Sequence, residues 1–174
     1  IEEIQGVYVP FWMFDGKASG EASYKATTSK VYEKGDEEIT ETRHYEVSRA
    51  GSIGFEKIPV DASSKMPDDH MDSIEPYDYS GLKEFSTAYL PGFLADKYDV
   101  SVKDSQKRAD TRCASTLEDA LRGTVTGYDS CALEHKQIDL KRGKVHYALL
   151  PVWMLHTKWN GQDFLFAMNG QTGK

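Results

Sequence analysis

The sequence has too few cysteines for the disulfide framework that stabilises many small secreted domains. Its two cysteines are Cys113 and Cys131, and their spacing is not that of a CxxC zinc or redox motif. Two reduced thiols are the favoured interpretation, and a single bridge between them stays open. A chain of 174 residues buries roughly two-thirds of its unfolded surface. We therefore expect one domain, or two small subdomains that share a core, and this core is large enough to be stable without a disulfide framework.

Positive charge is also scarce. The chain has 21 Lys and Arg against 28 Asp and Glu, a net charge of −7. Because phosphate neutralisation supplies most non-specific affinity for nucleic acid, nucleic acid is disfavoured as a partner of this chain. A local set of basic residues could share one side of a helix, and a solvated helix surface is the favoured interpretation of that set: Lys103, Lys107, Arg108 and Arg112.

Long apolar runs are missing as well. No segment reaches the roughly 20 apolar residues of a membrane-spanning helix, and no signal peptide is visible. The first residue, Ile1, is not an initiator methionine, and the chain stops inside the turn-like stretch Asn169–Lys174. We therefore expect a soluble fragment of a longer protein.

The motifs of common catalytic and metal sites are not found. None of the five histidines stands at HxxxH or HExxH spacing, and no GxSxG nucleophile elbow occurs. The stretch Gly170–Lys174 resembles the end of a phosphate-binding loop, but Met168 stands where that loop needs its first glycine. The sequence thus predicts no catalytic, cofactor-binding or metal-binding residue and no enzyme activity in this fragment, including no helicase or nucleotide hydrolysis.

The apolar patterns predict an α+β domain with mostly antiparallel strands. Strands are expected over 6–60 and 131–169, and a helical insert over about 67–126. The expected turns are those at 15–16, 34–36, 50–52, 141–144 and 160–161, and the Asn-Gly pair of the last is the strongest hairpin signal. The long helix at about 102–126 would bury a stripe made of Ala109, Cys113, Leu117, Ala120 and Leu121.

The two ends of the chain correspond when the sequence is shifted by about 141 residues. The same residue types recur without a gap in 7–27 and 148–168, and the markers of this repeat are Pro10, Trp12, Met13 and Gly20, which meet Pro151, Trp153, Met154 and Gly161. The interpretation is one hairpin used twice, flanking the helical middle. The two tryptophans bring a large buried area and are interpreted as halves of a shared core, with a ligand-binding role as the alternative.

Several stretches together resemble a family of uncharacterised bacterial zinc-ribbon membrane proteins. The matching motifs span essentially the whole chain: Gly6–Trp12, Phe55–Ser63, Glu75–Tyr79, Ala88–Tyr98, Tyr147–Met154 and Phe166–Lys174. Some members of that family carry names that link them to the primosomal replication-restart helicase. A weaker similarity connects the Asn-x-x-Thr-Gly turn at Asn169–Gly173 with PepSY-like domains, which are usually binding or inhibitory modules.

The resemblance implies a zinc ribbon before this region and a hydrophobic membrane anchor after it. Zinc is then expected in the parent protein and not in this fragment, and the location is the cytoplasmic face of a bacterial membrane. The hypothesis that follows is a non-catalytic binding or interaction domain with an unknown protein or small-ligand partner. The alternatives are an accessory domain of a DNA-handling, helicase-related protein and an unrecognised hydrolase.

Overall fold

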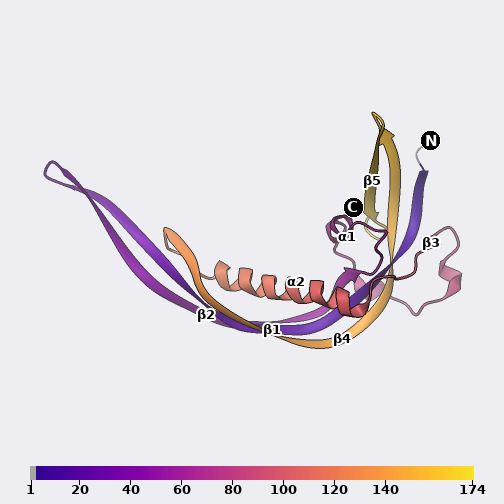
Figure 1. Cartoon of the computed structure of the whole chain (residues 1–174), viewed down its shortest axis with the longest axis horizontal. Helices are drawn as coiled ribbons and strands as arrows, with labels where there is room; N and C mark the ends of the chain where they lie inside the picture. Colours follow the sequence, from indigo (N-terminus) through magenta and orange to yellow (C-terminus); the bar gives the residue numbers. More distant parts are fainter. Residues whose placement is uncertain (1–2) are drawn as a thin grey trace. The chain divides into compact units, whose positions relative to one another are not determined.

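The computed structural model describes residues 3–174, and long strands dominate it (Figure 1). In chain order the elements are β1 (Glu3–Lys34), β2 (Glu37–Asp61), α1 (Asp68–Ser73), η1 (Tyr79–Gly81), η2 (Thr87–Tyr89), β3 (Leu94–Ala95), α2 (Val102–Gly123), β4 (Ser130–Trp159) and β5 (Gln162–Asn169). Strands make up 56% of the chain and helices 20%. The expected α+β fold with a helical middle is therefore wrong, because the molecule is a mostly antiparallel β-sheet protein with one long helix.

The strands form one sheet with the order β2-β1-β4-β5, and β3 adds a short parallel pairing to β1. The expected hairpin at Asn160–Gly161 is confirmed, because β4 and β5 pair from Trp159↔Gln162 to Val152↔Asn169. Both turn residues have positive φ, 49° for Asn160 and 79° for Gly161, as a two-residue type I′ turn requires. A second tight turn joins β1 to β2 at Gly35, as the sequence predicts.

The chain divides into two compact units. Unit 1 comprises the described residues up to Phe14, together with Lys57–Ala109 and Val145–Lys174. Unit 2 comprises Asp15–Glu56 and Asp110–Lys144. The single domain over 1–174 stays a prediction.

The core of unit 1 lies between the sheet and the segment around α1. Alternate residues of β1 and β4 point into it, and they meet Met71, Ile74 and Tyr77. The buried strand residues are Val7, Val9, Phe11, Met13, Ala148, Leu150, Val152 and Met154. On the opposite face of β1, Phe14 packs with Val60 and with Ala109 of α2. The segment 7–14 of β1 is therefore buried on both faces.

The core of unit 2 forms where α2 lies along one face of the sheet (Figure 1). Small residues of β1 give the helix room for close approach, namely Ala18, Ala22 and Ala26. The buried residues of α2 confirm the expected stripe at Ala109, Leu117 and Leu121. Cys113 is half-buried, whereas Ala120 is exposed, so the expected stripe is wrong at Ala120.

The expected repeat of two hairpins over 7–27 and 148–168 is wrong. Residues 148–168 do form a hairpin, but 7–27 is a continuous part of β1 without a turn at Asp15–Gly16. The cause is the close pairing of β1 with β4. A side chain at Gly16 would meet the carbonyl of Lys141 at 3.1 Å, and one at Gly20 would meet the carbonyl of Gln137 at 2.3 Å.

The turn expected at 141–144 fails for the same physical reason, because Gly143 lies in β4 against the backbone of Asp15. This glycine clears space for a neighbouring strand and does not reverse the chain. The turn expected at 50–52 is also wrong, because Gly51 lies inside β2. The repeat markers Gly20 and Gly161 thus differ in role, because one sits in a tight strand contact and the other in a turn.

The remaining repeat markers lie in unit 1. Pro10, Met13 and Met154 are buried, and Pro151 is half-buried. The two tryptophans are half-buried. Trp12 donates from Nε1 to the carbonyl of Val100 at 3.0 Å, and Trp153 stacks on Phe93 with ring centroids 5.3 Å apart.

The helical insert expected over 67–126 reduces to α1, two single 3₁₀ turns and α2. Within that insert Leu82, Phe85 and Tyr89 stand at helical spacing, but they are 41%, 67% and 50% exposed. An amphipathic helix gains its stability by burying that face. Without a surface to cover, and with Pro91 interrupting the backbone, this segment runs as an open loop.

Arg108 of α2 ties three parts of unit 1 together. One terminal nitrogen contacts the carboxylate of Asp61 at 2.8 Å and that of Asp68 at 3.1 Å, and the other contacts Asp72 at 3.3 Å. Asp61 is buried, and this burial raises its pKa while Arg108 opposes the rise. Together with the Lys107–Asp104 pair, these contacts pair the basic helix residues Lys107 and Arg108 with carboxylates.

Gly20→Ala should destabilise the protein by about 3 kcal/mol, because the new methyl group overlaps the Gln137 carbonyl. Gly54→Ala is the matched control, since a side chain there meets nothing within 4 Å, and its effect should stay within about 0.5 kcal/mol. Urea unfolding followed by circular dichroism measures both. Equal effects of the two variants would contradict the close β1–β4 pairing.

Arg108→Met should cost about 3 kcal/mol or more, because it leaves the Asp61 carboxylate buried without its partner. The double variant Asp61→Asn/Arg108→Met removes both charges and should be clearly more stable than Arg108→Met alone. Chemical unfolding of the two single variants and the double variant gives the coupling energy. A coupling energy near zero would show that the pair does not act as described.

Candidate functional site

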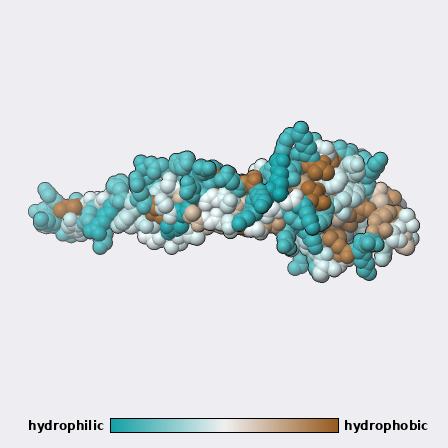
Figure 2. All heavy atoms as spheres, turned by 90° about the horizontal axis from the view of Figure 1, so that it is seen from below, coloured by the Kyte–Doolittle hydropathy of each residue, from teal (hydrophilic) through white to brown (hydrophobic). Residues whose placement is uncertain are grey.

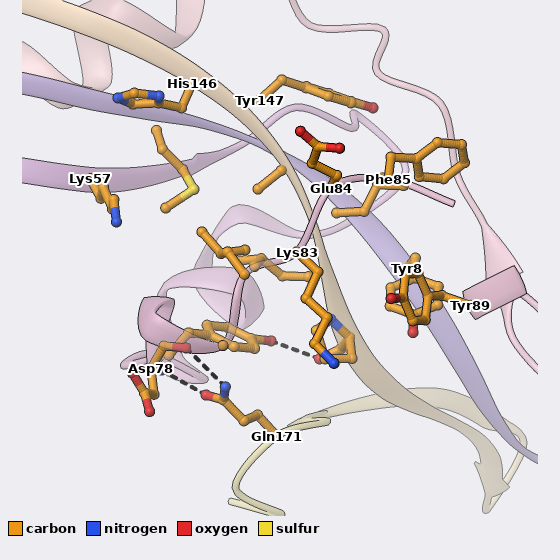
Figure 3. Close-up of a pocket in the computed structure, with 18 of the residues that line it drawn as sticks. Tyr8, Lys57, Asp78, Lys83, Glu84, Phe85, Tyr89, His146, Tyr147 and Gln171 are labelled. Carbon is orange, nitrogen blue, oxygen red and sulfur yellow. Dashed lines mark hydrogen bonds between the residues drawn. The ribbon is translucent and has the colours of Figure 1, made fainter. Parts of the chain in front are cut away.

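A pocket of 530 Å³ opens within unit 1 (Figure 3). Its walls are the β4 segment His146–Pro151, the segment between Tyr77 and Leu90, and the β1 side chains of Tyr8 and Met13. This volume lies in the range of pockets that hold small molecules and could also hold a short stretch of peptide. The exposed loop between Tyr77 and Leu90, which the sequence predicts to be helical, thus forms the outer wall of the pocket.

Apolar and aromatic side chains cover most of the pocket wall. They are Tyr8, Met13, Tyr77, Leu82, Phe85, Tyr89, Leu90, Tyr147, Ala148, Leu149, Leu150 and Pro151. In Figure 3, Tyr8 and Tyr89 lie toward one end of the pocket, and Lys57 and His146 lie toward the other. The wall therefore favours an apolar ligand surface along most of its length.

The charges at the pocket are balanced. Lys57 and Lys83 are matched by Asp78 and Glu84. The Asp78 carboxylate accepts hydrogen bonds from the hydroxyl and the backbone N–H of Ser80, at 2.6 and 2.9 Å, and these bonds lower the pKa of Asp78. The ammonium group of Lys83 lies 5.9 Å from the centre of the Tyr89 ring. A ligand without a large net charge fits this arrangement.

Lys57 has an unusual backbone conformation at the pocket wall. Its φ is 53°, in the left-handed region that non-glycine residues seldom adopt. Unlike Asn160, which has a similar φ, Lys57 lies inside a strand and not in a turn. Such strained residues cost about 1–3 kcal/mol and cluster at functional sites.

The pocket runs along an open edge of β4. Strand β5 pairs with β4 from Val152 onward, and in the described part of the chain no strand pairs with the same edge over 147–149. In the β4–β5 ladder the two-residue turn makes Trp159 and Gln162 a hydrogen-bonded pair, so odd-numbered β4 residues direct their N–H and C=O groups toward β5. This alternation places the backbone groups of Tyr147 and Leu149 on the open edge that borders the pocket.

The turn that begins at Asn169 fixes the start of the pocket loop, which is the segment between Tyr77 and Leu90. The side chain of Asn169 is fully buried and donates from Nδ2 to the carbonyls of Ile74 and Pro76, at 2.8 and 3.1 Å. Its Oδ1 accepts from the backbone N–H groups of Gln171 and Thr172. Because this amide has hydrogen-bond partners on both its oxygen and its nitrogen, it holds residues 74–76 against the end of β5 without leaving a buried polar atom unsatisfied.

Two further contacts continue this anchorage into the pocket wall. The side-chain amide of Gln171 pairs with both backbone groups of Asp78, at 2.6 and 3.0 Å. The hydroxyl of Tyr77 donates to the carbonyl of Pro151 at 3.0 Å, and burial raises the pKa of that hydroxyl. The wall thus begins at a fixed position, whereas its outer residues Leu82 to Tyr89 are exposed.

The sequence predicts no site residue, and two of the eight predicted repeat markers lie in the pocket wall. Met13 and Pro151 line the pocket, whereas Trp12, Trp153 and Gly161 do not. The pocket loop was mistaken for helix because its apolar residues have helical spacing. The signals in the sequence were the resembling stretches, because Glu75–Tyr79 contains the anchored residues Tyr77 and Asp78, and Tyr147–Met154 and Phe166–Lys174 contain further pocket residues.

The described residues form neither a metal-binding cluster nor a membrane-spanning helix. Among the residues that the structure describes, no group of three or more His, Cys, Asp or Glu side chains lies close enough together to hold a metal ion. Within 3–174, no helix combines the length and the apolar character needed to cross a bilayer.

Gln171→Ala should loosen the pocket loop, because it removes both hydrogen bonds to Asp78. We expect amide hydrogen exchange in peptides from 76–91 to accelerate about tenfold, with little change elsewhere. Thr172→Ala is the control, since its backbone N–H keeps its bond to Asn169. Unchanged exchange in the loop of Gln171→Ala would show that this turn does not anchor it.

Comparison with known proteins gives one bacterial relative. No family model matches the chain, and no solved structure matches it. All 174 residues align with an uncharacterized protein, YdjG, of Bacillus subtilis (strain 168), at 42% identity. The chain spans about half of that relative, 51% of its length. The chain is thus similar, over its whole length, to part of a longer bacterial protein.

Proposed function

We propose that the chain is a non-catalytic interaction domain that binds an extended peptide segment of a partner protein. The observation that carries this proposal is the open edge of β4 at Tyr147–Leu149 along an apolar pocket. An added strand can hydrogen-bond to such an edge, and pockets on either side select its alternating side chains. Unit 1 contains both features of this binding mode, the open strand edge and the apolar pocket beside it.

The chemistry of the pocket suggests what the bound segment contains. Its alternate side chains would contact Leu82 and Tyr89 on one wall, and Ala148 on another. Because the lysines and carboxylates at the pocket balance, the segment should be largely uncharged. Apolar or β-branched residues at alternate positions fit best, since they favour the extended conformation.

The longer protein supplies the cellular context of the proposal. We propose that a zinc ribbon precedes this region, that a hydrophobic anchor follows it, and that the domain works at the cytoplasmic face of the membrane. The support is the sequence resemblance at motifs such as Ala88–Tyr98 and Phe166–Lys174, together with a relative of about twice this length. Zinc would bind in the ribbon and not in this domain.

The structure favours peptide binding over the two alternatives. A DNA-handling role would use the basic side of α2, but Lys107 and Arg108 there are paired with carboxylates. A hydrolase that works by acid–base catalysis would be supported by a polar pocket with an acid or a histidine of shifted pKa. The pocket is mostly apolar, and hydrogen bonds from Ser80 lower the pKa of its residue Asp78.

An array of random octapeptides provides a direct test with the labelled 174-residue chain as the probe. We expect selected peptides with alternating apolar residues. When such a peptide is resynthesised with N-methyl groups, methylation of one alternate set of residues should abolish binding and methylation of the other set should preserve it. This asymmetry follows because alternate N–H groups of an added strand face the protein.

Two matched variants locate the binding site. Leu82→Glu places a charge at the pocket, and we expect it to weaken peptide binding at least tenfold. Leu133→Glu makes the same change at a 49% exposed position of β4 in unit 2 and should leave binding unchanged. Failure to select any peptide, equal loss from both methylation sets, or equal effects of the two variants would each refute the proposal.

A further inference from the structure

Strand β5 presents a second open edge, in a different part of unit 1. It is the last strand of the β2-β1-β4-β5 order, and among residues 3–174 no strand lies on its outer side. Its sequence, QDFLFAMN, contains no proline and no lysine. Natural proteins protect edge strands with such residues, with bulges or with a covering element, because an unprotected edge can pair with another chain.

The two faces of β5 differ in character. Leu165 and Ala167 pack against the core of unit 1. On the other face Phe164, Phe166 and Met168 are 39%, 55% and 38% exposed. Figure 2 shows hydrophobic residues gathered at the surface of unit 1. An apolar row beside a free backbone edge is the combination that a second strand would cover.

The hairpin register determines which backbone groups are free. Phe164 and Phe166 form hydrogen-bonded pairs with Thr157 and Leu155 of β4, by the same alternation that starts at the two-residue turn. The intervening residues Asp163, Leu165 and Ala167 therefore direct their N–H and C=O groups away from β4. These three residues offer six groups for one further strand.

We propose that β5 pairs with β5 of a second copy of this chain, antiparallel about a twofold axis at Leu165. The proposal does not depend on the peptide-binding function, because β5 and the β4 edge at Tyr147–Leu149 are separate. In this register Leu165 faces its own copy, and Asp163 faces Ala167 of the other copy. Asp163, Leu165 and Ala167 of each strand then all belong to hydrogen-bonded pairs between the two copies.

The side chains of β5 suit this self-pairing. Phe164 of one copy lies opposite Phe166 of the other, twice across the axis, and aromatic cross-strand pairs stabilise a sheet by about 0.2–1 kcal/mol each. The charged residue of the strand, Asp163, meets an alanine and not a second carboxylate. The chain's net charge of −7 therefore brings no repulsion into the strand pair itself. A twofold pairing also closes on itself and stops at a dimer.

Sedimentation velocity of the 174-residue chain, from roughly 1 to 100 µM, tests the self-association, because a small interface of this kind is expected to be weak. We expect a monomer–dimer equilibrium. Phe164→Lys/Phe166→Lys places lysines opposite each other in the dimer and should shift the protein to monomer, with at least a tenfold weaker association.

A charge-swapped variant tests the register. Phe164→Lys/Phe166→Glu removes the same apolar side chains but places a lysine opposite a glutamate at both pairs, so association should recover above that of the double-lysine variant. Both variants change exposed positions, and thermal unfolding should show that both remain folded. A monomeric wild type throughout the range, a double-lysine variant that still dimerises, or equal association of the two variants would overturn the proposal.

Discussion

The close pairing of β1 with β4 is the constraint on which both units depend. Glycines at 16, 20 and 143 let the two backbones approach where a side chain would collide with a carbonyl or a neighbouring residue. In unit 1 the same pair contributes most of the core residues, including Phe11, Met13 and Val152. In unit 2 the alanines of β1 form the surface on which α2 packs. The strands are therefore long because reversing either one would break this pairing.

The sequence predicted the local features well and the long-range ones poorly. The Asn160–Gly161 turn and the body of α2 were predictable, because a type I′ turn and an amphipathic stripe are encoded by adjacent residues. The turns expected at Asp15–Gly16 and at 141–144 were wrong, because glycine serves a turn and a close strand contact equally well. The two roles differ in which strand or helix lies opposite the glycine, and a single sequence does not show which element that is.

The candidate site was harder to predict for the same reason. Tyr77 meets Pro151 across 74 residues, and Gln171 meets Asp78 across 93. No periodicity in the sequence connects such positions. The apolar residues of the loop between Tyr77 and Leu90 were interpreted as a helix face, whereas in the structure they are the wall of a pocket. The repeated Pro-x-Trp-Met motif reflects two neighbouring strands of one sheet and not two copies of a hairpin.

The proposed function depends on an unpaired strand edge with an apolar wall, at Tyr147–Leu149. Amide hydrogen exchange resolved by NMR, with and without a saturating peptide selected on the array, examines that edge residue by residue. If the peptide adds as a strand, the amides of Tyr147 and Leu149 become protected when it binds, while the amide of Ala148, which faces β1, does not change. Protection confined to the loop between Tyr77 and Leu90, with no change at Tyr147 or Leu149, would contradict strand addition.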